Sequence, residues 1–112
     1  MLEPILGSTS SERVLIFILA RGEGYAREIA KFYDTNLLSI QNQLIKLEAG
    51  GVLVSRKAGR TRLFTFNPRY AFINELQGLL EKALTFYPEE MQEKLIMNRR
   101  RPRRSGKPDD TN

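Results

Sequence analysis

The stretch YAREIAKFYDTNLLSIQNQLIKLEAGGVLVSRKAGRTRLFTFNP, residues 25–68, decides the fold. Its first part, together with the two residues before it, predicts a short helix over EGYAREIAKFYD, residues 23–34. After a turn, apolar residues recur at the spacing of a second helix: Leu37, Ile40, Leu44 and Leu47. Asn36 is the expected N-cap of that helix, and Gly50 or Gly51 is expected to end it.

The second half of the stretch predicts a β-hairpin. VLVSRK and TRLFTF are rich in β-branched and aromatic residues, and the loop AGR between them contains a glycine. Residues 56–69 contain basic side chains and no acidic one: Arg56, Lys57, Arg60, Arg62 and Arg69. The hairpin is therefore the most basic part of residues 1–93.

Helices are predicted on both sides of this stretch. Residues 8–22 are apolar nearly all round, so that helix is expected at the centre of the core or against a second subunit. Thr9 and Glu12 in it have capping-box spacing. Downstream, Asn67 as cap and Pro68 as first residue predict a long amphipathic helix. Its apolar stripe is Phe72, Leu76, Leu79, Leu80, Ala83 and Tyr87.

The predicted organisation is mainly α, with a two-stranded hairpin. An N-terminal leader at residues 1–9 precedes one domain at residues 10–87, which includes the long helix. An extra helix is expected at residues 88–98, and a disordered basic tail at residues 99–112. Residues 94–112 carry seven basic and two acidic side chains, whereas the other 93 residues carry 11 of each.

The composition excludes several classes of protein. With 0 Cys and 0 His, the chain has no disulfide, thiolate or imidazole metal site. It also lacks a phosphate-binding glycine loop and clustered carboxylates, so we expect neither an enzyme nor a cofactor. The longest apolar run, VLIFILA, is too short to cross a bilayer. Without a signal-peptide pattern, the expectation is a cytoplasmic, nucleoid-associated protein with no membrane partner.

The order helix, helix, turn, helix, hairpin, long helix over residues 10–87 resembles winged helix-turn-helix repressors of the ArsR type, with MarR-type proteins as cousins. Ala30 takes the small position where two helices cross, and LIKLEAGGVL, residues 44–53, matches the exit into the wing. The chain departs from the family at Asp34, where glycine is usual, although Asp tolerates the left-handed conformation. Gln41 and Gln43 stand where the family often has Ser and His. Metal-sensing members rely on Cys or His clusters that are absent here.

The resemblance implies a dimeric, sequence-specific DNA-binding regulator, with repression as the expected role. The recognition helix, residues 37–49, would enter the major groove of double-stranded DNA, and the wing, residues 52–67, would contact the backbone. The candidate DNA-binding residues are Leu38, Ser39, Gln41, Asn42, Gln43, Lys46, Lys57, Arg60 and Arg62. Amides can pair with adenine and apolar groups can touch the thymine methyl, so a target rich in A·T is predicted.

Other interpretations stay open. The helix face could be an ordinary solvated surface, and the wing charges could serve only to block edge pairing. The hairpin with Leu38 and Ile45 could instead bind a protein, without specific DNA binding. A homodimer is expected because the hairpin cannot cover all the apolar surface. A small-molecule effector is not identified, and its pocket would be expected at the dimer interface. RRRPRR, residues 99–104, could contact DNA by counterion release, lie along the acidic helix of its own dimer, or have no role.

Overall fold

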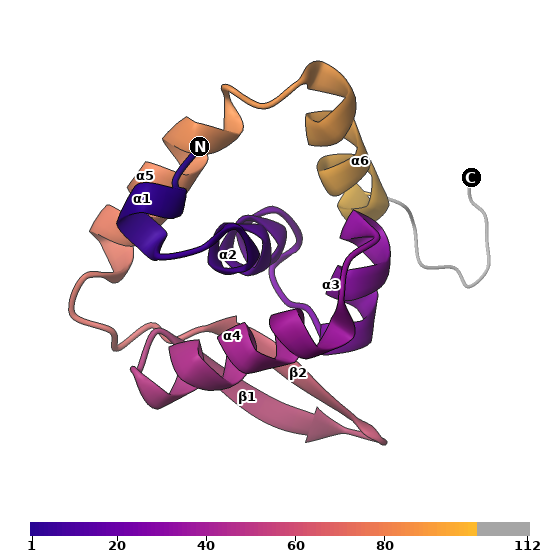
Figure 1. Cartoon of the computed structure of the whole chain (residues 1–112). Helices are drawn as coiled ribbons and strands as arrows, with labels where there is room; N and C mark the ends of the chain where they lie inside the picture. The colour runs from indigo at the N-terminus through magenta and orange to yellow at the C-terminus, as the bar shows by residue number, and fades with distance from the viewer. Residues whose placement is uncertain (101–112) are drawn as a thin grey trace.

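One helix, α2 (Thr9–Arg21), lies at the centre of the computed structural model, and the other elements surround it (Figure 1). The side chains of five consecutive residues, Val14 to Ile18, are at most 1% exposed. A helix that is apolar on all sides has to be covered on all sides. Helices α1, α3, α4, α5 and α6 and strand β2 each contact it. The expectation of a central helix is therefore confirmed.

Apart from α1, a short helix in the expected leader that the sequence did not predict, the remaining elements follow the expected order. The fold is mainly helical with one two-stranded antiparallel hairpin. They are α1 (Glu3–Leu6), α3 (Ala26–Tyr33), α4 (Leu37–Ala49), β1 (Leu53–Ala58), β2 (Thr61–Phe66), α5 (Ile73–Leu84) and α6 (Glu89–Arg100). The structure describes the backbone of residues 1–100 and the side chains of residues 1–96. Most of the expected basic tail, residues 101–112, lies outside the described residues.

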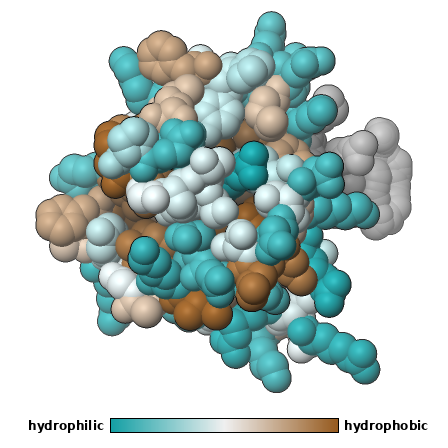
Figure 2. Space-filling view, in the orientation of Figure 1, coloured by the Kyte–Doolittle hydropathy of each residue, from teal (hydrophilic) through white to brown (hydrophobic). Residues whose placement is uncertain are grey.

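The turn between α3 and α4 depends on one left-handed residue. Asp34 has φ 52° and ψ 55°, and the next amide, that of Thr35, donates to the carbonyl of Ala30 at 2.9 Å. Asn36 then caps α4, because its Oδ1 accepts from the amide of Ser39 at 3.0 Å. Both sequence expectations for this turn are confirmed. The outer side of α4 faces solvent, where Figure 2 shows apolar patches among hydrophilic side chains.

The hairpin is tight and is anchored to the domain along one edge. Its two-residue loop begins at Gly59, whose φ of +66° is the positive value that primed hairpin turns require. On the inner face, Leu53 and Phe64 are buried, at 1% and 6% exposure. Phe64 also exchanges two backbone hydrogen bonds with Gly24, of 2.8 and 3.1 Å. This isolated β-bridge fixes the edge of the hairpin beside the segment that leads into α3.

Two predicted features at helix starts are wrong. The long helix starts at Ile73, not at Pro68. Asn67 does not cap this helix, because its side chain stabilises the turn that precedes it. Its Oδ1 accepts from the amide of Arg69 at 3.0 Å, and its Nδ2 donates to the carbonyl of Gly51 at 2.9 Å. Phe72 consequently leaves the apolar stripe and is 62% exposed.

The other error concerns the cap of α2. Ser8, not Thr9, is its N-cap, and the Ser8 Oγ accepts from the amide of Ser11 at 3.0 Å. Glu12 is therefore not a capping-box residue but a buried carboxylate with 5% exposure.

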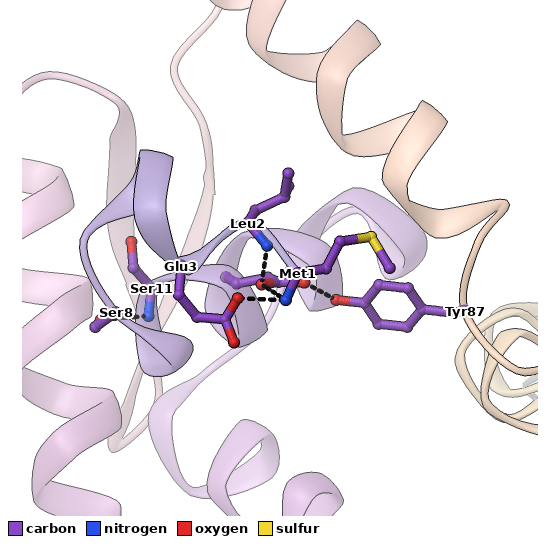
Figure 3. Close-up of polar contacts among 7 residues, drawn as sticks. Met1, Leu2, Glu3, Ser8, Ser11 and Tyr87 are labelled. Carbon is purple, nitrogen blue, oxygen red and sulfur yellow. Dashed lines mark hydrogen bonds and ion pairs between the residues drawn. The ribbon is translucent and has the colours of Figure 1, made fainter.

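Glu12 joins the chain's first residues to the α5–α6 linker. Its carboxylate accepts from the amide of Leu2 at 2.7 Å and from the hydroxyl of Tyr87, and it pairs with the ammonium group of Met1 at 3.3 Å. Figure 3 shows Met1, Leu2 and Tyr87 converging on this point. Burial, with the neighbouring carboxylate, raises the pKa of the Tyr87 phenol above its ordinary value. The network holds the segment that leads into α1 and the α5–α6 linker against α2.

We expect Asp34→Val to lower the free energy of unfolding by about 1–2 kcal/mol, because a β-branched residue tolerates positive φ poorly. The measurement is urea unfolding at one fixed protein concentration. Asp34→Asn is the matched control, since Asn removes the charge and still adopts the left-handed conformation. Equal stability of the Val and Asn variants would contradict the role given to this turn.

Candidate nucleic-acid interface

The outer face of α4 is apolar and amide-bearing. Ile40 and Leu44 point into the core with 0% and 1% exposure, and the step of about 100° per residue turns Leu38 and Asn42 outward. Leu38 and Ile45 are each 62% exposed. Gln41 and Asn42 lie between them and are exposed. This face carries hydrogen-bonding amides next to apolar side chains that no described element covers.

A groove runs between this face, the start of α3 and strand β2. Its volume is about 440 Å³. Its lining residues are Tyr25, Ala26 and Arg27 from the start of α3, Leu38, Gln41, Asn42, Leu44 and Ile45 from α4, and Arg60, Thr61, Arg62 and Phe64 from the hairpin. Three elements that are separate in the sequence thus meet at one concave surface.

The groove is electropositive. Among the described residues that line it, Arg27, Arg60 and Arg62 are basic and none is acidic. Neither Arg27 nor Arg60 has a side-chain hydrogen bond or ion pair to another described residue. Their guanidinium groups are therefore free to meet an anion in the groove. Arg56, by contrast, pairs with Glu23 at 3.1 Å outside the groove.

Arg62 is held by a chain of hydrogen bonds that ends on α4. Its Nη1 donates to the hydroxyl of Ser55 at 3.0 Å, and that hydroxyl donates to Oε2 of Glu48 at 2.7 Å. Lys57 lies directly opposite Arg62 in the strand register, so two like charges share one face of the hairpin. The Ser55–Glu48 link offsets this repulsion and ties the hairpin to the end of α4.

The structure brings together some of the predicted site residues and leaves others apart. Those that share the groove are Leu38, Gln41, Asn42, Arg60 and Arg62. Those that do not line it are Ser39, Gln43, Lys46 and Lys57. Lys46 and Lys57 are nevertheless exposed, whereas Ser39 and Gln43 are half-buried.

Sequence reasoning missed Arg27. Its place in the groove depends on how α3 crosses α4 and on where the hairpin folds back, and neither is visible in the sequence. The one feature of the sequence that could have indicated Arg27 was its position relative to the buried face of α3. It stands two residues before the buried Ile29, which turns its side chain away from the core.

Neither a cluster of metal ligands nor a membrane-spanning helix is found in the part of the chain that the structure describes. Within residues 1–100, no group of three or more acidic, Cys or His side chains is placed to hold a metal ion. Nor does that part contain a helix of the length and apolar character that a membrane span requires.

Comparison with known proteins identifies the fold. No protein-family model matches the sequence, and a search of curated protein sequences finds no match. Solved structures do match. The winged helix-turn-helix domain of Mb0332 from Mycobacterium bovis aligns with a TM-score of 0.55 at 20% identity, over 80% of each chain. It is described as homodimeric, DNA-binding and part of a possible ArsR-family transcriptional regulator.

Two further structures give the same result. A mutant of ZitR from Lactococcus lactis, in its apo form, aligns with a TM-score of 0.53 at 20% identity, over 80% of this chain and 76% of ZitR. The transcriptional regulator BldR from Sulfolobus solfataricus aligns with a TM-score of 0.52 at 16% identity, over 88% of this chain and 79% of BldR. The predicted winged helix-turn-helix fold is therefore confirmed, with the β1–β2 hairpin as its wing.

We expect Ser55→Ala to release the Arg62 side chain from α4. The heteronuclear NOE of the Arg62 Nε–Hε group should fall toward that of a mobile side chain, and the free energy of unfolding should drop by about 1 kcal/mol. Thr65→Ala is the control, because Thr65 also lies in the hairpin but on its outer face. An unchanged NOE in the Ser55 variant would show that the hydroxyl does not restrain Arg62.

Proposed function

We propose that this winged-helix chain is a homodimeric, sequence-specific DNA-binding transcriptional regulator of the ArsR type. It acts in the cytoplasm, on the nucleoid, as a repressor that occupies its operator. The observation that carries the proposal is the shared groove, where the exposed face of α4 and two wing arginines open on the same side. A recognition helix and a wing that face one way can contact one stretch of DNA together.

The side chains of the groove suit two kinds of contact with DNA, one with the bases and one with the phosphates. Gln41 and Asn42 carry amides that can pair with adenine, and Leu38 can touch the thymine methyl, so α4 selects A·T pairs. Arg27, Arg60 and Arg62 supply positive charge for phosphates, which gives affinity without reading sequence. The absence of an arginine from α4 is thus compensated by α3 and the wing.

The dimer follows from apolar side chains on another part of the surface. Ile5 on α1, Phe72 before α5 and Phe86 after it are 69%, 62% and 66% exposed. Helices α1 and α5 lie on the same side of α2 (Figure 1). A second copy that covers these residues removes apolar surface from water. It also presents two recognition helices to half-sites roughly one helical turn apart.

One observation favours a second candidate function. Leu38 and Ile45 are as exposed as Phe72, and large apolar side chains on an outer face also suit a protein partner. In that case the winged helix would be an interaction module without specific DNA binding.

Fragment selection followed by mobility shift tests the proposal. Purified protein should select A·T-rich fragments from genomic DNA, and their affinity should fall steeply between two salt concentrations. Asn42→Ala should change which fragment is preferred, with a cost of about 1–3 kcal/mol at the affected base pair. Arg60→Ala should weaken all fragments about equally and reduce the salt slope by about one.

The outcomes separate the two functions. An absence of any shift at physiological salt would support the protein-interaction module. A G·C-rich selected motif would overturn the assignment of α4 to A·T pairs. If Asn42→Ala, like Arg60→Ala, lowered the affinity for all fragments without changing which fragment is preferred, α4 would not read the DNA sequence.

We expect Ile5→Asp to convert the dimer to a monomer, because the substitution places a charge in the proposed apolar interface. Size-exclusion chromatography with light scattering measures the change in mass. Leu38→Asp is the matched control, since Leu38 has a similar exposure but lies on α4, and it should remain dimeric. A wild-type chain that is monomeric at micromolar concentration would contradict the dimer.

A further inference from the structure

The two most exposed large apolar side chains of the described residues lie on different segments. They are Ile5 on α1 and Phe86 in the linker between α5 and α6. Neither segment is rigid by itself. α1 is a helix of four residues, too short to be stable alone, and none of its own side chains is fully buried. The linker, residues 85–88, belongs to neither helix. The positions of Ile5 and Phe86 therefore depend on contacts with other elements.

Ile5 is held through Leu2. The carbonyl of Leu2 accepts from the amides of Ile5 and Leu6, at 3.0 and 2.8 Å, so the first turn of α1 is bonded to this one peptide group. The side chain of Leu2 is buried in the core, and its amide donates to Oε1 of Glu12 at 2.7 Å. The start of α1 is thus joined to α2 through the Glu12 carboxylate.

Phe86 is held through its neighbour Tyr87. The Tyr87 hydroxyl donates to Oε2 of the same Glu12 carboxylate. The Tyr87 carbonyl accepts from Nε2 of Gln92 on α6 at 2.9 Å, and the amide of Phe86 donates to the carbonyl of the buried Ala83 at 3.0 Å. Each oxygen of one buried carboxylate therefore holds a different segment of the chain (Figure 3).

We propose that Glu12 is a positioning residue of the dimer, because it holds Ile5 and Phe86 in the arrangement that a second copy of the chain covers. Hydrogen bonds to a carboxylate are stronger than those between neutral groups, and burial strengthens them further. Apolar side chains that are fixed before association lose less conformational entropy when the interface forms. The effect on association rests on the proposed homodimer, whereas the order of the two segments does not.

Tyr87→Phe tests the linker side, because it removes one hydroxyl and keeps the ring. The dimer dissociation constant, measured by sedimentation equilibrium on the full chain, should rise at least about fivefold. The ¹⁵N heteronuclear NOE of the Phe86 amide should fall, and it should fall equally in the background of Phe72→Asp, a substitution in the proposed interface. Tyr33→Phe is the matched control. The Tyr33 hydroxyl is buried without a hydrogen-bond partner among the described residues, so its removal should leave both measurements unchanged.

Glu12→Leu removes both hydrogen bonds at once. The heteronuclear NOEs of the Ile5 and Phe86 amides should then fall together, and the dimer should weaken at least as much as in Tyr87→Phe. Adding Tyr87→Phe to Glu12→Leu should cause no further loss of dimer affinity, since the hydroxyl no longer has a carboxylate to bind.

Two results would overturn the role of Glu12 while the homodimer stands. One is a wild-type dimer whose dissociation constant changes no more in Tyr87→Phe than in Tyr33→Phe. The other is a loss of dimer affinity in the double variant that equals the sum of the two single losses. A wild-type chain that is monomeric would overturn the homodimer and the positioning role together. The heteronuclear NOEs would then still decide whether Glu12 orders the two segments.

Discussion

The structure depends on the complete burial of α2. Because residues 14–18 are apolar on every side of this helix, each other helix and the wing has to contribute a covering face. α4 covers it with Ile40 and Leu44, which leaves Leu38, Asn42 and Ile45 outside. α6 covers it with Leu95, which is 0% exposed. The outward face of α4 is thus a consequence of how the core is filled.

A second set of contacts makes the wing and α4 one surface. Backbone hydrogen bonds between Gly24 and Phe64 hold one edge of the hairpin, and the Arg62–Ser55–Glu48 chain joins its inner face to the end of α4. Arg21, at the end of α2, restrains α6 in a similar way. It stacks over Phe17 with its guanidinium carbon 4.5 Å from the ring centroid, and it donates to the carbonyls of Lys94 and Leu95 on α6.

The sequence predicted correctly those features that depend only on residues close together in the chain. The left-handed turn at Asp34, the cap at Asn36 and the outward side of α4 each depend on residues within one or two helical turns. The predictions failed where a distant group competed. Asn67 was expected to cap a helix, but its side-chain amide donates a hydrogen bond to the carbonyl of Gly51. Glu12 was expected in a capping box, but its carboxylate accepts a hydrogen bond from the hydroxyl of Tyr87. Nothing in the local sequence shows such long-range partners.

The amino-acid sequence by itself determined the order of elements, the central helix and the identity of α4 and the wing, since hydrophobic periodicity and turn residues act over short distances. It also indicated Arg60, Arg62, Gln41 and Asn42 as candidates. Only the tertiary structure decided that these residues share one groove, that Arg27 joins them and that Lys57 and Lys46 do not line it. The reason is that the groove lies between three elements, whose separation and angle are set by packing around α2 and not by any one of their sequences.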